Sequence, residues 1–428
     1  MKLNKKVLTF ISTVFLFSNL NAKDVVLEEL IDIAIQNNSD IKIGKYKENI
    51  KDSNYKNSKA NYLPKVSSKV ELANYEITSM GNRVDDNVTG ISLTVNQLIY
   101  DFGKTSNSID SAKEEYFASN FETAKNISST VLKTKQVYYD ILSNFQRIEL
   151  AKESIKMDEL HLEQAEKYYN AGVRTLIDVT DAKLKLSNSK LELIQAQYSL
   201  KNSKTKLISV LGVEDINKIE IKNEKDIILL AKNLKNNDAN LDNLLNSGYE
   251  NRAELKMYEK LINSQNLKIK SVNAEYYPRL DFDAGYSDKN SDEIQSIDTR
   301  QVTAGIYLKW DIYTGNSTDA NKKSAVSNLG ILKQQLTQQR LQIKEEVTNA
   351  YFDLKQNEEN INISLLSVDL SSQKLNLANQ RYKAGLNDLV ELNESKLQYI
   401  ESKNKLINSY YNYLLSKANI DYAIGVIY

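Results

Sequence analysis

The chain of 428 residues repeats itself at an interval of about 213 residues, and this duplication restricts its fold more than any other feature. Local sequence agrees with the interval, since residues 350–354 (Ala-Tyr-Phe-Asp-Leu) follow residues 137–141 (Val-Tyr-Tyr-Asp-Ile) by 213 positions. Four pairs of helix-breaking residues keep the interval to within one position: Pro64 and Pro278, Gly103 and Gly315, Gly172 and Gly385, and Gly212 and Gly425. A repeat of this kind predicts one structural unit used twice.

Each copy has the same order of predicted elements, namely a helix, a pair of strands, a long helix, a tip and a final helix. The first copy covers residues 23–212, the second covers 241–428, and a polar connector at 213–240 joins them. The predicted strands lie at about 65–77, 88–100, 279–287 and 301–313, the long helices at about 104–170 and 316–382, and the tips at about 169–178 and 382–391.

The long helices are predicted to form coiled coils. Residues 104 to 169 contain neither Pro nor Gly, and as one helix they would be ~100 Å long. Apolar and small side chains step by four and three along this stretch, which is the seam of a coiled coil: Ile127, Val131, Thr134, Tyr138, Ile141, Phe145 and Ile148.

The four predicted strands alternate apolar and polar side chains, as strands of a transmembrane β-barrel do. One set is predicted to face water inside such a barrel: Lys69, Glu71, Ser92, Thr94, Asp281, Asp283, Tyr307 and Lys309. Aromatic residues at the strand ends suit a membrane interface: Tyr100, Trp310 and Tyr313. Four strands cannot close a barrel, whereas three copies would supply twelve. The same alternation also fits a half-buried sheet in a soluble protein.

Residues 1–22 have the form of a cleavable secretory signal peptide, with a basic start, an apolar run from Val7 to Phe17 and a polar end at Ala22. The alternative is an N-terminal anchor helix, which normally needs about 20 apolar residues. The apolar run here is shorter, so cleavage after Ala22 is the prediction.

Composition and motifs exclude several classes of function. The 56 basic and 56 acidic residues balance, so no basic surface predicts nucleic-acid binding, and the absence of Cys excludes thiolate metal sites. No phosphate-binding loop, His-based metal spacing or nucleophile motif is present, so we predict no catalytic residue, metal or cofactor and no enzyme activity. The only histidine, His161, is expected on a helix surface among charges. A soluble periplasmic coiled-coil scaffold remains the main alternative, although it would not explain the strands.

The duplicated motifs make the chain resemble the TolC-type outer-membrane efflux channel family, the outer membrane factors of tripartite efflux and type I secretion systems. The resemblance covers essentially the whole mature sequence. Its motifs are Tyr62-Leu63-Pro64 and Tyr277-Pro278 before the strands, Tyr100-Asp101-Phe102-Gly103 and Tyr313-Thr314-Gly315 after them, and the two Tyr-x-x-Gly tips. It implies a mainly α fold with a transmembrane β-barrel portion, in which a homotrimer builds a 12-stranded barrel continued by a periplasmic α-helical barrel of about 100 Å.

The resemblance also implies a function. The protein would be a channel-tunnel in the bacterial outer membrane that passively conducts substrates from a periplasmic adaptor and an inner-membrane transporter to the exterior, opening by an iris-like movement of its tips. The implied partners are two further copies of the chain, the adaptor, the transporter and outer-membrane lipid, with no nucleic acid. The transported substrate is left open, because in such systems the pump largely selects it.

The resemblance assigns roles to residues at the tips. In the family, the second repeat carries a ring of acids that narrows the entrance and selects cations, and Tyr and Arg contacts hold it shut. Matching from Gly385 puts the acids on Glu391 and Glu394 and the Tyr on Tyr382, while the Arg position is Asn387. The first repeat has the full pattern at the same places: Tyr169, Arg174, Asp178 and Asp181.

Two questions about the tips stay open from the sequence. Because the second repeat lacks the Arg, its Tyr and acids would have to contact other residues, or Arg174 of the first hairpin would reach an acid of the second. Either repeat could therefore line the closed entrance. The residues at the two reversals are expected to contact the adaptor, although a Gly there is needed for the reversal itself: Ala171, Gly172, Val173, Ala384, Gly385 and Leu386.

Overall fold

The computed structural model describes residues 23–24, 26–79, 82–214, 219–222, 226–234, 240–291, 299–386 and 388–426. The predicted signal peptide at 1–22 and the gate position Asn387 lie outside these residues. The chain divides into two compact units, and each unit draws on both halves of the duplicated sequence. Unit 1 consists of residues 1–38, 130–237 and 353–418, and unit 2 consists of residues 39–129, 238–352 and 419–428.

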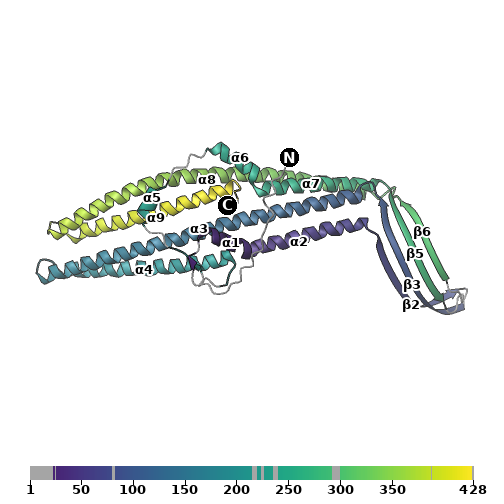
Figure 1. Ribbon diagram of the computed structural model, residues 1–428, viewed down its shortest axis with the longest axis horizontal. Coiled ribbons are helices and arrows are strands. Elements are labelled where there is room, and N and C mark those ends of the chain that lie inside the picture. The colour runs from purple at the N-terminus through teal and green to yellow at the C-terminus, as the bar shows by residue number, and fades with distance from the viewer. Residues whose placement is uncertain are drawn as a thin grey trace. The chain divides into compact units, whose positions relative to one another are not determined.

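Unit 2 contains a four-stranded antiparallel sheet, shown in Figure 1. Its strands are ordered β2-β3-β5-β6, and their bounds are β2 (Lys65–Ser79), β3 (Asn82–Tyr100), β5 (Arg279–Ser291) and β6 (Thr299–Lys309). Each copy of the repeat supplies one hairpin, and the hairpins pair through β3 and β5. Strands β2 and β6 are the edges of the sheet and have no further strand partner among the described residues.

The strands differ from their predicted bounds at several ends, and β5 continues to Ser291 rather than 287. Strand β3 begins at Asn82 rather than 88, because polar side chains that predicted a loop pair across the hairpin, as in the 2.9 Å bond from Asn74 Nδ2 to Asn87 Oδ1. Strand β6 ends at Lys309 rather than 313. Directly after it, the indole Nε1 of Trp310 donates to the carbonyl oxygen of Tyr276 at 3.1 Å, so the chain leaves the ladder there.

The sheet has one polar and one apolar face, as the alternation predicts. The register puts all eight predicted water-facing residues on the same face, for example Lys69 opposite Ser92. Ion pairs line that face, since Lys69 Nζ and Lys289 Nζ lie 3.4 and 3.2 Å from Glu71 Oε2. The other face of β2 carries exposed apolar side chains: Val66, Val70 and Leu72.

Helices make up much of the rest of unit 2, and those directly before and after the hairpins lead into and out of the sheet. They are α2 (Ser39–Lys59), α6 (Leu241–Asn251), α7 (Ala253–Asn273), the first parts of α3 (Lys104–Asn170) and α8 (Ser317–Lys383), and the end of α9 (Leu389–Ala423). Helices α2 and α7 each end in a single 3-10 turn before a proline, η1 (Ala60–Tyr62) and η2 (Ala274–Tyr276). Both lie along α3, through the 2.7 Å ion pair of Lys51 with Glu115 and the 2.9 Å bond shared by Ser111 and Ser264.

A buried arginine joins the helices of unit 2 at the start of α7. Arg252 is 3% exposed, and its guanidinium donates to both carboxylate oxygens of Glu254 at 2.9 and 3.0 Å. It also donates to Glu346 on α8 at 2.8 Å and to the carbonyl oxygen of Ala423 on α9 at 3.3 Å. One cation therefore connects three helices.

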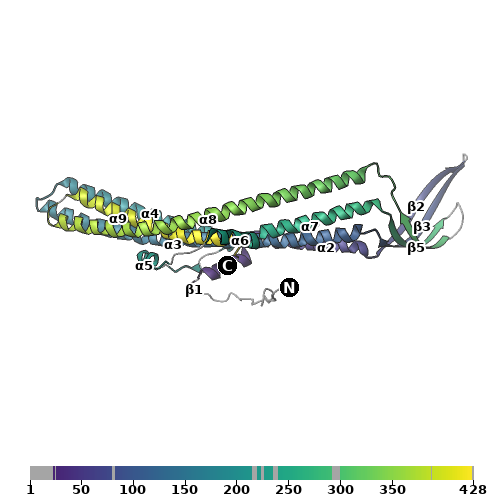
Figure 2. The ribbon, with the colours of Figure 1, turned by 90° about the horizontal axis from the view of Figure 1, so that it is seen from above.

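Unit 1 contains two helical hairpins, which Figures 1 and 2 show with their tips at the same end. The first hairpin consists of the remainder of α3 and the whole of α4 (Leu176–Leu211). The second consists of the remaining parts of α8 and α9. The small helix α1 (Leu27–Asn37) packs against the end of α4, where Asn38 Nδ2 donates to the carbonyl oxygen of Val210 at 2.8 Å.

The described residues of the connector include two short regular elements. Strand β4 (Ile219–Glu220) pairs in parallel with β1 (Lys23–Asp24), and a short helix α5 (Ile227–Lys232) follows. The helix forms because Asp226 caps it, accepting from the backbone N–H groups of Ile228 and Leu229. Ile227 is buried on its first turn.

Helix α3 buries one side along the predicted coiled-coil seam. Val131, Thr134, Ile141 and Ile148 are buried, which confirms the steps of three and four. The seam continues through Ala151, Ser154, Asp158, His161 and Ala165, all of them buried. The prediction that His161 lies on the surface is therefore wrong, because the same period that buries Ile148 also turns His161 inward. No helix within the described residues is long and apolar enough to cross a membrane.

Candidate functional site

The first tip reverses the chain between α3 and α4. Gly172 adopts a φ of 73°, and the backbone N–H groups of Val173 and Arg174 donate to the carbonyl oxygen of Tyr168 at 2.9 and 3.3 Å. Helix α4 then starts with a capping box, in which Asp178 Oδ2 accepts from the backbone N–H and the hydroxyl of Thr175, both at 2.9 Å. This predicted acid therefore also fixes the start of its helix.

The second tip has the same backbone form. Gly385 adopts a φ of 71°, and the N–H of Leu386 donates to the carbonyl oxygen of Arg381 at 2.9 Å. Asp388 Oδ1 accepts from the backbone N–H of Glu391 at 3.0 Å, so an acid again caps the following helix. Arg381 Nη1 lies 3.3 Å from Glu391 Oε1, which partly neutralises the predicted entrance acid.

The two tips meet at Tyr382. Its side chain is 1% exposed and stands edge-on to Tyr168, with ring centroids 5.8 Å apart and planes at 69°. The guanidinium carbon of Arg174 lies 5.7 Å from the centroid of the same ring. Apolar neighbours complete this environment: Leu375, Ala378, Leu389 and Leu392. We call Tyr168, Arg174 and Tyr382 the tip contact.

Electrostatics at the tip contact favour a neutral tyrosine. Burial raises the pKa of Tyr382, and the nearby Arg174 cation opposes that rise only in part. The hydroxyl of Tyr382 has no hydrogen-bond partner among the described residues, so the ring makes the contacts. The hydroxyl of Tyr168 lies 3.5 Å from the carbonyl oxygen of Lys383, on the second hairpin.

The structure brings together some of the predicted site residues and separates others. Arg174 does reach the other hairpin, where its guanidinium lies against the ring of Tyr382. Tyr169 is 43% exposed, and its neighbour Tyr168 takes the place predicted for it. Extending the seam of α3 from Ala165 by three residues identifies Tyr168, so helical phase is the signal that the repeat alignment missed.

The remaining predicted residues are exposed at or near the tips. Asp181 and Glu394 are exposed, and Glu394 lies 3.8 Å from Lys374. No other group of the described residues lies within 4 Å of the Cβ position of Gly172 or Gly385. The other predicted adaptor contacts are exposed as well: Ala171, Val173, Ala384 and Leu386. The tips therefore present small and apolar side chains to solvent.

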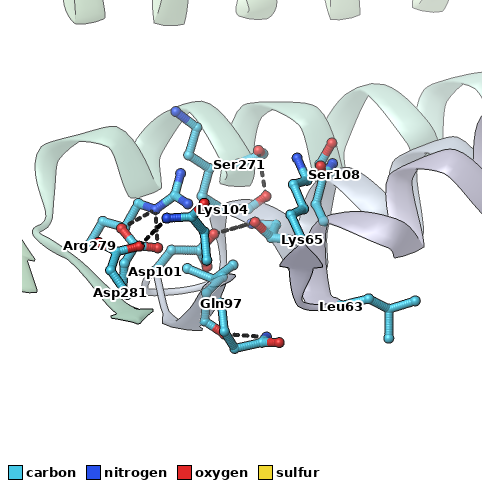
Figure 3. Close-up of a pocket in the computed structure, with 14 residues that line it drawn as sticks. Leu63, Lys65, Gln97, Asp101, Lys104, Ser108, Ser271, Arg279 and Asp281 are labelled. Atoms are coloured by element: carbon cyan, nitrogen blue, oxygen red, sulfur yellow. Dashed lines mark hydrogen bonds and ion pairs between the residues drawn. The ribbon is translucent and has the colours of Figure 1, made fainter. Parts of the chain in front are cut away.

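A second polar site lies where the sheet of unit 2 meets its helices, in a pocket of about 490 Å³. Figure 3 shows Arg279 and Asp281 turned toward one another, and their charged atoms are 2.7 Å apart. Asp101 accepts from the backbone N–H of Thr105 at 2.8 Å and so caps α3. Lys104 pairs with Glu275 at 2.9 Å. Asp101, Lys104, Arg279 and Asp281 thus have partners within the fold. The described residues contain no acid, His or Cys cluster suited to a metal.

Comparison with known proteins decides the family. The family described as outer membrane efflux protein matches residues 30–213 and 224–426, nearly the whole of each repeat. The chain belongs to this family. It is an outer-membrane protein with a long periplasmic part, and its relatives are channel proteins rather than enzymes.

Individual relatives agree with this assignment. The chain is 20% identical over 363 residues to outer membrane protein TolC of Salmonella enteritidis, covering 81% of this chain and 71% of that protein. It is also 20% identical over 411 residues to the probable efflux pump outer membrane protein TtgC of Pseudomonas putida, covering 94% and 83%. The crystal structure of the Campylobacter jejuni CmeC outer membrane channel has the same fold, with a TM-score of 0.82 at 16% identity over 93% of this chain and 85% of that one.

Proposed function

We propose that the protein is a channel-tunnel that passively conducts substrates from a periplasmic adaptor and an inner-membrane transporter to the exterior, and that it opens by an iris-like movement of its tips. The observation that carries this proposal is the tip contact. Residues of one hairpin, Tyr168 and Arg174, enclose Tyr382 of the other. A movement of one hairpin away from the other must break this contact, so it is suited to hold an entrance closed.

The sheet supports the channel part of the proposal. Each edge strand, β2 and β6, pairs on one side only and has no strand partner on its other side among the described residues. Unpaired backbone groups are costly in lipid, so each edge would pair with a neighbouring copy. Three copies would give twelve strands with the face of Lys69 and Glu71 inside and the face of Val66 and Val70 toward lipid. A soluble scaffold would have no use for this exposed apolar face.

The acids at the tips would set the ion preference of the entrance. In a trimer, Glu391 and Glu394 would occur three times around a narrow axis, where like charges raise one another's pKa values and attract cations. Asp178 and Asp181 of the first hairpin would add to this field. The relatives named for efflux make small-molecule export the favoured use, while the choice of substrate belongs to the pump.

The acids are tested by single-channel recording of the purified trimer in planar bilayers. The double variant Glu391→Gln with Glu394→Gln is expected to lower cation selectivity and to lose block by divalent and trivalent cations. The control is Glu401→Gln, an exposed acid farther along the same helix, which should behave as the unmodified protein does. Unchanged selectivity and block in the double variant would contradict the acidic entrance.

Adaptor docking at the tips is tested separately. Ala384→Trp adds a bulky side chain at an exposed tip position and is expected to abolish efflux while trimers and membrane insertion persist. Gly330→Trp is the control, because that helical position is also exposed and has open space around its Cβ position. If both variants export equally well, the tips do not contact the adaptor. Recovery of the protein as soluble periplasmic material, rather than as outer-membrane trimers, would refute the channel itself.

A further inference from the structure

Three polar residues interrupt the buried seam of α3 between Ala151 and Ala165. Ser154 and Asp158 are each 2% exposed, and His161 is 6% exposed. Seam positions in a coiled coil normally hold apolar side chains, and a polar residue there reduces stability in exchange for a specific partner. Three in succession indicate a built polar site inside unit 1.

The partners of this site come from the other helices of unit 1. Lys396 Nζ of α9 lies 2.6 Å from Asp158 Oδ2, and their side chains are 10% and 2% exposed. The hydroxyl of Ser189 on α4 donates to the same carboxylate oxygen at 2.5 Å. Ser154 shares a 3.0 Å hydrogen bond with Ser189. The carboxylate of Asp158 therefore holds groups from both hairpins.

His161 adds the fourth helix. It forms a side-chain hydrogen bond with Asn379 of α8, while its Nδ1 is buried and has no hydrogen-bond partner among the described residues. The charged groups that act on it are Asp158 of its own helix and Lys396 of α9. Helix α8 offers it the neutral amide of Asn379, and α4 contributes the neutral Ser189 to the same site. We call the six residues the clasp: Ser154, Asp158, His161, Ser189, Asn379 and Lys396.

The clasp lies behind the tips on both hairpins. Asp158 precedes Gly172 by 14 residues and Lys396 follows Gly385 by 11 residues, or about 21 and 17 Å of helix. A hairpin that swings outward at its tip must therefore either bend beyond the clasp or pull it apart. A buried ion pair resists being pulled apart, because separation leaves two charges without partners.

We propose that the clasp is a proton-operated hold on the closed entrance, in which neutral His161 leaves Asp158 and Lys396 paired and protonated His161 weakens that pair. The inference rests on the proposed gated channel. Protonation of His161 at Nδ1 would place a second buried cation beside Lys396. The two cations would then have to share the single carboxylate of Asp158. The two hairpins would then separate more easily at this level.

The direction of the pH effect follows from burial. Burial lowers the pKa of His161 in the packed state below its ordinary value of about 6.5, with Asn379 and Asp158 opposing and Lys396 assisting. A state with separated hairpins exposes the imidazole and binds the proton more tightly. The hold of the clasp is therefore complete above the ordinary pKa and weakens as pH falls through it. For each pH unit by which packing lowers the pKa of His161, the ratio of open to closed channels should rise about tenfold at acidic pH.

The test measures the conductance of the full-length trimer in planar bilayers between pH 7.5 and 5.5. The unmodified protein should open more often as pH falls, and His161→Asn should change by less than about twofold over this range. The control is Glu153→Gln, which breaks another contact between α3 and α9, the 2.6 Å pair with Lys403, but leaves His161 in place. It should keep the pH response.

A second variant reverses the sign. In Lys396→Gln, protonated His161 replaces Lys396 as the cation that can pair with Asp158, so acidification should favour the closed state instead of the open one. The clasp is overturned if His161→Asn keeps the full pH response, or if Lys396→Gln still opens on acidification. Trimers of every variant that carry no current at any pH would instead refute the proposed channel, so the two failures can be told apart.

Discussion

The sharpest structural prediction concerns two glycines that share a backbone conformation but differ in their surroundings. Gly172 has a φ of 73° and nothing within 4 Å of its Cβ position. Gly212 has a φ of 67°, but an added Cβ would lie 2.6 Å from the carbonyl oxygen of Asn37 and 3.1 Å from the Cα of Asn38. Substituting both separates the strain of the left-handed backbone from that of a backbone clash.

The magnitudes follow from these contacts. Alanine in the left-handed region costs about 1–2 kcal/mol, and this applies to Gly172→Ala and Gly212→Ala alike. In Gly212→Ala the added Cβ must also displace α1. Loss of the 2.8 Å hydrogen bond from Asn38 to Val210 would then add about 0.5–1.5 kcal/mol. Gly212→Ala should therefore cost about 2–4 kcal/mol in total, and the upper value applies if the helix cannot move far enough to relieve the clash.

Hydrogen exchange by mass spectrometry is the suitable assay, because a large protein of two units is not expected to unfold in two states. Amides of α1 and the last turn of α4 should lose protection by about 30- to 1000-fold in Gly212→Ala, since 1.4 kcal/mol is a factor of ten. In Gly172→Ala a loss of about 5- to 30-fold should stay within the tip.

Asparagine variants separate backbone strain from the clash with α1. Asn accepts the left-handed region with little strain, so Gly172→Asn should be nearly neutral. Gly212→Asn keeps the clash with Asn37 and should remain strongly destabilised. Equal protection in the two Asn variants would refute the contribution of the α1 contact.

Two further predictions concern buried cations and the tips. Arg252→Met removes the cation between Glu254 and Glu346 and should destabilise unit 2 by about 3–5 kcal/mol. Arg300→Met, which breaks an exposed pair with Asp288, should cost less than about 1 kcal/mol. Equal losses of thermal stability in the two variants would contradict this prediction. Tyr382→Phe should keep the entrance closed, because the ring makes the tip contact, whereas Arg174→Ala should raise resting conductance in bilayers. A leaky Tyr382→Phe channel would show that the hydroxyl matters.

The architecture could be predicted from the sequence because its signals are local and repeated. Alternation within single strands assigns the polar and apolar faces, and the register then agrees at all eight predicted positions. The two Gly tips follow from a residue type that the left-handed turn requires. Strand ends were less certain, since Asn74 and Asn87 look like loop residues until they are paired across the hairpin.

The tip contact and the clasp were harder to predict, because both depend on helical phase and on distant pairs. The repeat interval aligns Tyr382 with Tyr169, but burial follows the seam of α3 and selects Tyr168. His161 and Asp158 look like surface residues beside charged neighbours, and Lys396 follows Asp158 by 238 residues. Continuing the heptad period past Ile148 would have placed both inside. It would not have identified their partner on α9.

Two of the contacts that join the hairpins differ in strength, so they would have different roles in the proposed gate. The cation–π contact of Arg174 with Tyr382 is near the surface and is worth about 0.5–2 kcal/mol. Breaking the buried pair of Asp158 and Lys396 costs about 3–5 kcal/mol if one charge is left alone. Loss of the tip contact alone therefore frees only the part of each hairpin beyond the clasp. A wide opening needs the clasp to yield as well, and protonation of His161 lowers that cost without any change in the tips.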